Sequence, residues 1–213
     1  MVVSAPSDRD AELAAFRSEQ RERCRALRRA AGQEMRDAVA KNVDRVVDAL
    51  LLERPDACIA FYWPIQGEIA LFPSMQRACE RGATVALPIV VAKDTPLVFR
   101  QWTLATAMEP GMWNIPIPSA SAREVDPHAL LVPLVGYDDA GYRLGNGGGF
   151  YDRTLAVRVP RPLAIGVGFM SLRMASIRPH EHDMPMDFVV TEAPLDDALV
   201  CARIRARCID GGK

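Results

Sequence analysis

The sequence predicts an α/β fold, a single domain in which helices flank both faces of a mostly parallel central sheet. Strand-like and helix-like segments alternate along the chain, which is the pattern of parallel strands joined by helical crossovers. The segments ALLVPLV (129–135) and LAIGVGF (163–169) are almost continuously apolar, as central strands covered on both faces are. At 213 residues, the chain has the length of one such domain with a sizeable core.

Two helices are expected to open the domain after a flexible tail over residues 1–9. The first is predicted over about residues 10–29 and the second over about residues 33–52, with the Ala31-Gly32 pair between them. The second helix repeats apolar residues at helical spacing, so one apolar stripe can lie on a sheet. This stripe consists of Val39, Val43, Val46, Val47 and Leu50.

The middle of the chain then alternates. ACIAFYW (57–63) is predicted as a strand, residues 71–81 as a helix, and TVALPIV (84–90) and LVFRQW (97–102) as further strands. Residues 103–125 contain prolines and no clear period, which predicts a long loop over the site.

The domain is expected to span residues 10–205. The basic segment CARIRARCIDGGK is predicted as a solvated last helix, and residues 206–213 as a C-terminal tail. Five cysteines are scattered without a Cys-x-x-Cys pair, which argues against structural zinc and a disulfide framework.

The composition excludes several classes of partner. The formal net charge is −1, so no general electrostatic attraction to nucleic acid or to an anionic membrane is expected. No apolar run approaches the length of a membrane span, and the N-terminus lacks the pattern of a secretory signal. We therefore expect a cytoplasmic protein with small-molecule ligands, and a monomer in preference to an oligomer.

The most informative segment is RLGNGGGFYDR (143–153), a glycine-dense loop between a predicted strand and a helix predicted over residues 150–159. Glycine adopts positive φ angles without strain, so successive N–H groups can form a concave nest for an anion. The positive end of the following helix lies at the same place. Arg143 can neutralise a phosphate there, and Asp152 can hold a cation beside it.

A glycine-rich surface hairpin is the alternative interpretation of this loop. The segment is not a P-loop, because it lacks the Gly-Lys-Ser/Thr ending. It is not a dinucleotide fingerprint either, because the glycine spacing differs. The flanking strand, helix, arginine and acid favour a phosphate cradle.

The block PLVGYDDAGYRLGNGGGFYDRTLA (133–156) resembles the signature of the 5-formyltetrahydrofolate cyclo-ligase (methenyltetrahydrofolate synthetase) family. The resemblance extends from about Phe16 to about Glu192. It includes FYWPIQGEIA, RGATVALPIV, MWNIPIP and HDMPMDFVVTE at plausible spacings. It implies an α/β fold of the type shared with sugar-phosphate isomerases and CoA transferases.

The resemblance also implies a reaction. In this family ATP phosphorylates the formyl oxygen of 5-formyltetrahydrofolate, N10 attacks the activated carbon, and phosphate leaves to give 5,10-methenyltetrahydrofolate. Mg²⁺ is the implied cofactor and ATP the co-substrate. Asp152 and Asp183 match the metal positions, and Arg143 and Asp152 are the implied catalytic residues.

The same resemblance assigns binding residues. Glu68 and Trp63 match positions that contact the pterin, and the substrate set also includes the loop residues Asn146, Gly147, Gly148, Gly149 and Phe150. The implied ATP-binding set is Arg17, Arg21, Arg143, Leu144, Gly145, Asn146, Gly147, Gly148, Gly149, Phe150 and Tyr151.

These residues also have plainer interpretations. Arg17 and Arg21 can belong to the solvated face of a charged helix, Glu68 can be a helix N-terminal acid, and Trp63 can be a packing residue. Trp113 can cover the folate or anchor a lid. His180, Glu181 and His182 are interpreted as surface or supporting residues.

The chain departs from the family pattern at several positions. Arg17 replaces a lysine, Leu172 stands where many relatives carry Gln, and Ile117 stands where they carry Glu. Asn146 and Gly148 replace basic residues that some relatives have in the loop. A catalytically altered folate- or nucleotide-binding paralogue and a sugar-phosphate isomerase-like enzyme are therefore alternative hypotheses.

Overall fold

The structure is a computed structural model that describes residues 8–210. Within that range the helices are α1 (Asp8–Ala30), α2 (Gln33–Glu53), α3 (Phe72–Glu80), α4 (Phe150–Val157) and α5 (Asp197–Asp210), with 3-10 turns η1 (Met112–Asn114) and η2 (Met170–Leu172). The strands are β1 (Cys58–Ala60), β2 (Thr84–Ile89), β3 (Val98–Gln101), β4 (Met108–Pro110), β5 (Pro116–Pro118), β6 (Ala129–Pro133), β7 (Gly136–Tyr137), β8 (Arg143–Leu144), β9 (Leu163–Val167) and β10 (Phe188–Val190).

The central sheet has the order β10-β9-β6-β1-β2-β3 among the described residues. Its strands are parallel, except that β3 runs antiparallel to β2 at one edge. β6 lies in the middle and pairs with β1 on one side and β9 on the other. The predicted mostly parallel α/β sheet is therefore confirmed.

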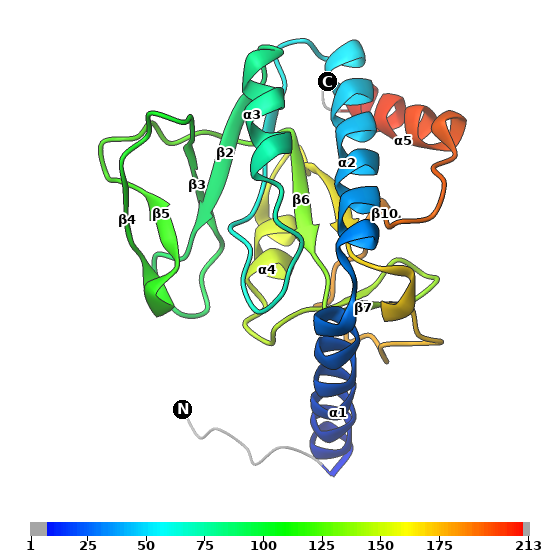
Figure 1. Cartoon of the computed structure of the whole chain (residues 1–213). Helices are drawn as coiled ribbons and strands as arrows, with labels where there is room; N and C mark the ends of the chain where they lie inside the picture. Colours follow the sequence, from blue (N-terminus) through cyan, green and yellow to red (C-terminus); the bar gives the residue numbers. More distant parts are fainter. Residues whose placement is uncertain (1–7, 211–213) are drawn as a thin grey trace.

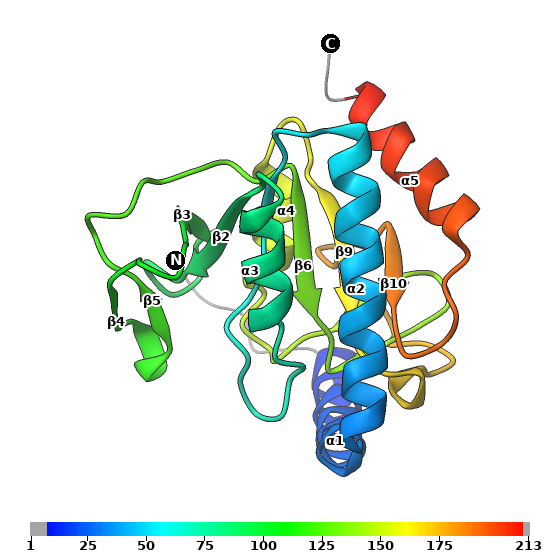
Figure 2. The ribbon, with the colours of Figure 1, turned by 45° about the horizontal axis from the view of Figure 1, so that its top comes forward.

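The two helical crossovers lead in opposite directions along the sheet. From β1 the chain passes through α3 to the neighbouring strand β2, and from β6 it passes through α4 to β9, on the other side of the centre. Because such crossovers are right-handed, the two helices lie on opposite faces. Figures 1 and 2 show α2 and α3 on one face and α4 behind the sheet.

This strand order sets the place of a ligand site. In a doubly wound sheet, ligands bind at the carboxyl ends of the strands, where the direction of winding reverses. Here that point lies between β1 and β6. In Figure 1, α1 lies at the end of the sheet to which the arrow of β6 points.

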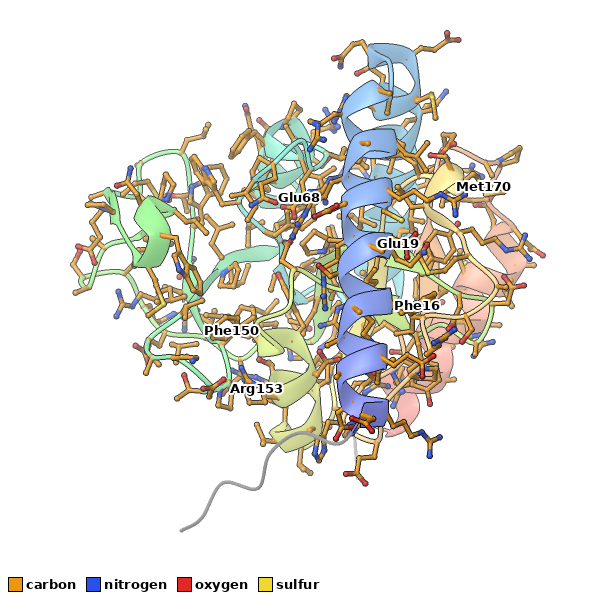
Figure 3. The ribbon with its side chains drawn as sticks, turned by 90° about the horizontal axis from the view of Figure 1, so that it is seen from below. Phe16, Glu19, Glu68, Phe150, Arg153 and Met170 are labelled. Carbon is orange, nitrogen blue, oxygen red and sulfur yellow. The ribbon has the colours of Figure 1, made fainter. Side chains whose placement is uncertain are left out.

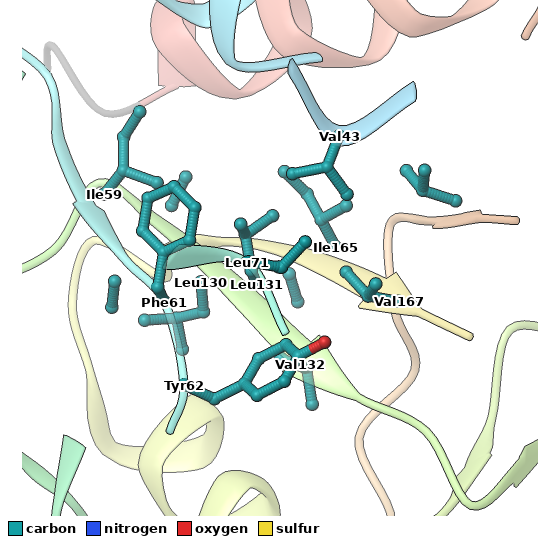
Figure 4. Packing of buried hydrophobic residues seen from close by; sticks show 14 of the residues in the cluster. Val43, Ile59, Phe61, Tyr62, Leu71, Leu130, Leu131, Val132, Ile165 and Val167 are labelled. Atoms are coloured by element: carbon teal, nitrogen blue, oxygen red, sulfur yellow. The ribbon is translucent and has the colours of Figure 1, made fainter. Parts of the chain in front are cut away.

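The core lies between the sheet and its helices. Ile59, Leu131 and Ile165 from adjacent strands are fully buried, as is Val43 on the predicted apolar stripe of α2 (Figure 4). The whole stripe is buried, which confirms that α2 packs on the sheet. The apolar runs of β6 and β9 are buried in nearly every position, because both faces of these strands are covered.

Several predicted boundaries were wrong. α1 begins at Asp8, within the expected N-terminal tail, and α5 continues to Asp210, through most of the segment expected as a C-terminal tail. The rest of both predicted tails, 1–7 and 211–213, lies outside the described residues. The predicted strand 57–63 is shortened to Cys58–Ala60, because the chain leaves the sheet there to build the loop before α3.

The segment 103–125 is also more regular than predicted. It contains β4 and β5, an antiparallel ribbon outside the main sheet. Three of the six residues in these strands are prolines, which are tolerated in such a ribbon because it has free edges. β10 was not predicted at all, since three residues give no periodic signal.

A buried hydroxyl fixes the helix that carries part of the predicted site. Thr154 of α4 is 0% exposed, and its hydroxyl accepts a hydrogen bond from the Leu97 N–H at 2.8 Å. Thr154→Val keeps the shape of the side chain and leaves that N–H without its partner. We expect the free energy of unfolding to fall by about 1–3 kcal/mol, measured by denaturant titration. An unchanged transition midpoint would contradict this role of the hydroxyl.

Within residues 8–210, no helix combines the length and the apolar character that crossing a membrane requires. Cys24, Cys58, Cys79 and Cys201 are free thiols. Burial is the main cause that raises the pKa of Cys58 to about 11, so this thiol stays protonated at neutral pH.

Candidate functional site

A cavity of about 560 Å³ opens at the carboxyl ends of the central strands. Residues that follow β1 and β2, such as Tyr62 and Val90, line it together with Pro133 at the end of β6. Every residue of the predicted site lines this one cavity: Arg17, Arg21, Trp63, Glu68, Arg143, Leu144, Gly145, Asn146, Gly147, Gly148, Gly149, Phe150, Tyr151, Asp152 and Asp183. The site thus lies where the strand order predicts it.

The glycine loop uses the conformational freedom of its residues at two positions. Gly147 has φ 104° and Gly149 has φ 64°, both in the region that favours glycine. Gly149 precedes the first turn of α4, and no side chain caps that turn. The N–H groups at this helix end remain open to an anionic ligand.

Three arginines of α1 line the cavity, and two of them contact this loop. The Arg21 Nε donates to the Gly145 carbonyl at 2.9 Å, and an Arg25 Nη donates to the Asn146 Oδ1 at 3.1 Å. Arg17, one helical turn before Arg21, forms an ion pair with Asp183. Burial, followed by the charges of Arg17 and Arg25, lowers the pKa of Arg21. This clustered positive charge would be relieved by a polyanion.

Both predicted metal ligands are paired with arginines. Arg143, which is buried, donates to both carboxylate oxygens of Asp152, at 2.7 and 3.0 Å. Asp152 also accepts the Met184 N–H at 3.0 Å. Asp183 accepts from Arg17 and from the His180 N–H at 2.6 Å. The chain between Asp183 and Met184 therefore brings the two carboxylates to the same part of the cavity.

Glu68 lies beside Asn146 of the glycine loop and is almost fully buried, at 7% exposed. Its Oε2 accepts the Ile65 N–H at 3.1 Å, and its Oε1 has longer contacts with the Asn146 amide at 3.4 Å and with an Arg28 Nη at 3.5 Å. Burial raises the pKa of this carboxyl, against the opposing effect of its donors. Figure 3 shows Glu68 and Phe150 on the same side of α1.

Aromatic and aliphatic side chains form the apolar wall. Trp63 packs edge-to-face on Phe72 with ring centroids 4.8 Å apart, and Trp113 packs on Phe150 at 5.8 Å. Trp113 is 65% exposed and lies at the tip of the β4–β5 ribbon, which also contributes Ile117 to the cavity. The segment predicted as a loop over the site does border it, in the form of a hairpin.

The departures from the family pattern fall into two groups. Leu172 is fully buried in the core and does not line the cavity, whereas Ile117, Asn146 and Gly148 do. His180, Glu181 and His182 are exposed, with possible ligand atoms within 4.8 Å of one another. Exposure of all three agrees with their interpretation as surface residues.

Two arginines at the cavity were not predicted from the sequence. Arg25 lines the cavity, and Arg28 is buried behind it in contact with Glu68. A signal was present, because Arg17, Arg21, Arg25 and Arg28 follow one another at spacings of four, four and three, which places them on one helical face. It was hidden by the many other charged residues of α1.

The sequence model of the 5-formyltetrahydrofolate cyclo-ligase family matches residues 14–192. A 5-formyltetrahydrofolate cyclo-ligase of Mycolicibacterium smegmatis is 30% identical over 172 residues, which cover 77% of this chain and 87% of the relative. The enzyme of that name from Haemophilus influenzae is 29% identical over 143 residues, covering 64% of this chain and 76% of the relative.

Two solved structures are also similar. The NMR structure of a 5,10-methenyltetrahydrofolate synthetase from Aquifex aeolicus is 26% identical, with a TM-score of 0.66 and coverage of 84% of this chain and 91% of that one. A synthetase of that name from Mycoplasma pneumoniae shares the fold, with a TM-score of 0.64 at 20% identity, covering 83% of this chain and 99% of that one. The chain belongs to the 5-formyltetrahydrofolate cyclo-ligase family.

Proposed function

We propose that the chain catalyses the ATP-dependent cyclisation of 5-formyltetrahydrofolate to 5,10-methenyltetrahydrofolate, with release of ADP and phosphate. Membership of the cyclo-ligase family supports this reaction. The observation that carries it is that one cavity is lined by arginines and a glycine loop and also by a buried carboxylate and several aromatic side chains. The first set of residues suits ATP phosphates, and the second suits a pterin.

The phosphate part acts mainly through charge and position. Arg17, Arg21 and Arg143 line it, together with the open N–H groups before α4. Transfer of a phosphoryl group depends on placing the two reactants in line and on spreading negative charge onto such donors. In the free protein Arg17 and Arg143 form ion pairs with Asp183 and Asp152. With ATP bound, both arginines also interact with the phosphates.

The proposed reaction has two chemical steps. The formyl oxygen attacks the γ-phosphorus of ATP, and ADP leaves with the electrons of the broken P–O bond. The N10 lone pair then attacks the activated formyl carbon, N10 loses its proton, and the C–O bond breaks as phosphate leaves. The residues that line the cavity must hold N10 close to the formyl carbon and keep water from the activated intermediate.

Asp152 and Asp183 fit a magnesium ion by their chemistry, because Mg²⁺ prefers one or two carboxylates together with phosphate oxygens. Both carboxylates line the cavity beside the glycine loop. The ion would supply charge neutralisation for the transferred phosphoryl group. Their arginine partners are then free to bind phosphate.

Glu68 is proposed to bind the pyrimidine ring of the pterin, which offers an amino group and a ring N–H side by side. A carboxylate accepts both hydrogen bonds. The long contacts of Oε1 leave this oxygen able to accept a better-placed donor. Trp63 and Trp113 then supply apolar surface to the rest of the ligand.

We expect Glu68→Gln to weaken binding of 5-formyltetrahydrofolate by about 1–3 kcal/mol, because one acceptor oxygen becomes a donor that faces a donor. ATP affinity should change much less, since the contact of Glu68 with the glycine loop is the long one to the Asn146 amide, at 3.4 Å. Titration of each ligand separately measures both effects. Glu80→Gln, at an exposed position of α3, is the matched control. Equal folate affinity in wild type and Glu68→Gln would remove the pterin assignment.

The direct test of the proposal is formation of the methenyl product. Protein, ATP, Mg²⁺ and 5-formyltetrahydrofolate are mixed, and the absorbance of 5,10-methenyltetrahydrofolate is followed. Product should form only when all four are present. Binding of both ligands without product would identify a paralogue that has lost turnover, and absence of ATP binding would favour an isomerase-like enzyme.

Three further properties belong to the same proposal. The α/β fold is proposed to be akin to that of sugar-phosphate isomerases and CoA transferases. The protein is proposed to act in the cytoplasm as a monomer. It is proposed to bind small molecules and neither nucleic acid nor membrane, in keeping with its near-zero net charge.

A further inference from the structure

Arg28 of α1 is a charged residue whose side chain is almost completely buried. It is 2% exposed and is among the largest fully buried side chains. Its guanidinium donates to the Gln66 carbonyl at 2.9 Å and to the Leu134 carbonyl at 3.3 Å. It also contacts the Glu68 carboxylate at 3.5 Å, so the fork of this side chain joins α1 to the loop after β1 and to the end of β6.

The Arg28–Glu68 pair is buried on both sides. The two side chains are 2% and 3% exposed, yet Glu68 lines the cavity and Arg28 does not. A buried ion pair gives little net stability, because taking both charges from water offsets their attraction. Its place directly behind a cavity residue therefore points to a role in binding.

We propose that Arg28 is a positioning residue for substrate recognition, which holds Glu68 from behind the cavity as an ionised, correctly oriented acceptor for the pterin. This inference rests on the proposed function of Glu68. Arg28 itself does not touch the substrate. Its effect passes through the carboxylate and through the Gln66 and Leu134 carbonyls, which fix the backbone on either side of the site.

The surroundings of Glu68 show why such a cation is needed. Burial is the largest influence on Glu68 and raises its pKa, whereas Arg28 lowers it. Ile65 and Asn146 add neutral donors, and the buried Tyr62 and Tyr151 phenols face the carboxylate without supplying charge. Burial, followed by the charges of Arg25 and Arg36, lowers the pKa of Arg28, and the charge of Glu68 opposes this lowering.

Loss of Arg28 should shift folate binding to higher pH. Glu68 accepts both pterin hydrogen bonds only when it is ionised, at a pH above its pKa. Removal of a group that shifts this pKa therefore shifts the pH range in which folate binds. Without Arg28, the Glu68 pKa rises further, so folate affinity is lost over a pH range in which the wild-type protein still binds. Affinity then recovers as the pH is raised, because Glu68 ionises again.

The experiment is a titration of 5-formyltetrahydrofolate, without ATP, from about pH 5 to about pH 9, which spans the range of a raised carboxyl pKa. The proteins are wild type, Arg28→Met, Arg28→Lys and Glu68→Gln. In Arg28→Met the pH midpoint of affinity should rise by about 1–3 units, the usual effect of an adjacent opposite charge. Arg28→Lys keeps the charge and should stay close to wild type.

Glu68→Gln gives the pH dependence that belongs to the folate itself, and ATP affinity monitors the fold of every variant. If Arg28→Met does not fold, Arg28→Gln replaces it, since the amide can still donate to one of the carbonyls. The comparison of Arg28→Gln with Arg28→Lys then isolates the charge.

The outcomes separate a positioning role of Arg28 from a purely structural one, and both from a failure of the Glu68 assignment. A purely structural role of Arg28 would lower folate affinity by the same factor at every pH and leave the midpoint in place, which would overturn the inference. If Glu68→Gln binds folate as wild type does, the proposed function of Glu68 fails instead. A raised midpoint in the uncharged variants, absent from Arg28→Lys, supports the positioning role.

Discussion

Gly147→Val should weaken ATP binding by about 10- to 100-fold while the chain keeps its fold. Gly147 has φ 104°, where a branched residue is strained, at a cost of about 1–2 kcal/mol. A Cβ at this position would lie 3.7 Å from the Arg21 Cζ, so the two methyl groups would extend toward the arginine that faces the loop. The backbone strain lowers the stability of the fold, and the displaced phosphate contacts weaken ATP binding by about 1–3 kcal/mol. Nucleotide titration measures the effect.

Gly82→Val is the matched control for this change. Gly82 also has a positive φ, of 94°, and a Cβ there would meet no atom within 4 Å. It does not line the cavity. The control should therefore show the backbone strain as reduced stability, with normal ATP affinity. Normal nucleotide affinity in a folded Gly147→Val protein would remove the glycine loop from the phosphate site.

Asp152→Asn should lower the rate of methenyl formation by about 100-fold and increase the concentration of Mg²⁺ required. The asparagine keeps an oxygen that can accept the Met184 N–H but has no negative charge for the ion. It also loses half of the two-pronged contact with Arg143. The rate measured across a magnesium series, together with metal affinity, tests both effects.

Asp187→Asn is the control for losing an ion pair with arginine at a carboxylate outside the cavity. Asp187 binds Arg161 and Arg207 and does not line the cavity, so this variant should retain activity and its normal magnesium requirement. If Asp152→Asn has unchanged metal affinity and excess Mg²⁺ leaves its defect in place, Asp152 does not act as a metal ligand.

The sequence predicted the sheet where the physical signal is strong. β6 and β9 are buried on both faces, so their residues are apolar without interruption, and the stripe of α2 follows from one face lying on that sheet. β10 and the β4–β5 ribbon have three-residue strands. Such strands depend on neighbours that are distant in sequence, and local patterns do not reveal those neighbours.

The site was predictable to the extent that its chemistry is local. Residues 143–153 combine strand end, glycine loop, arginine and acid within eleven positions, and all of the predicted site residues meet in one cavity. The partners of the charged residues were not predictable. Arg28 and Glu68 lie 40 positions apart, and Arg17 and Asp183 lie 166 apart, so only the fold brings these pairs together.

The reversal of winding between β1 and β6 also affects how this protein can diversify. The backbone leaves room for a ligand there whatever side chains line it, because neighbouring crossovers diverge to opposite faces. Part of the lining, including Ile117 and Trp113, comes from a ribbon outside the main sheet. Substitutions in that ribbon can alter ligand selectivity while the packed centre of the domain stays intact. Architecture and selectivity are thus carried by separate parts of the chain, and each can evolve at its own pace.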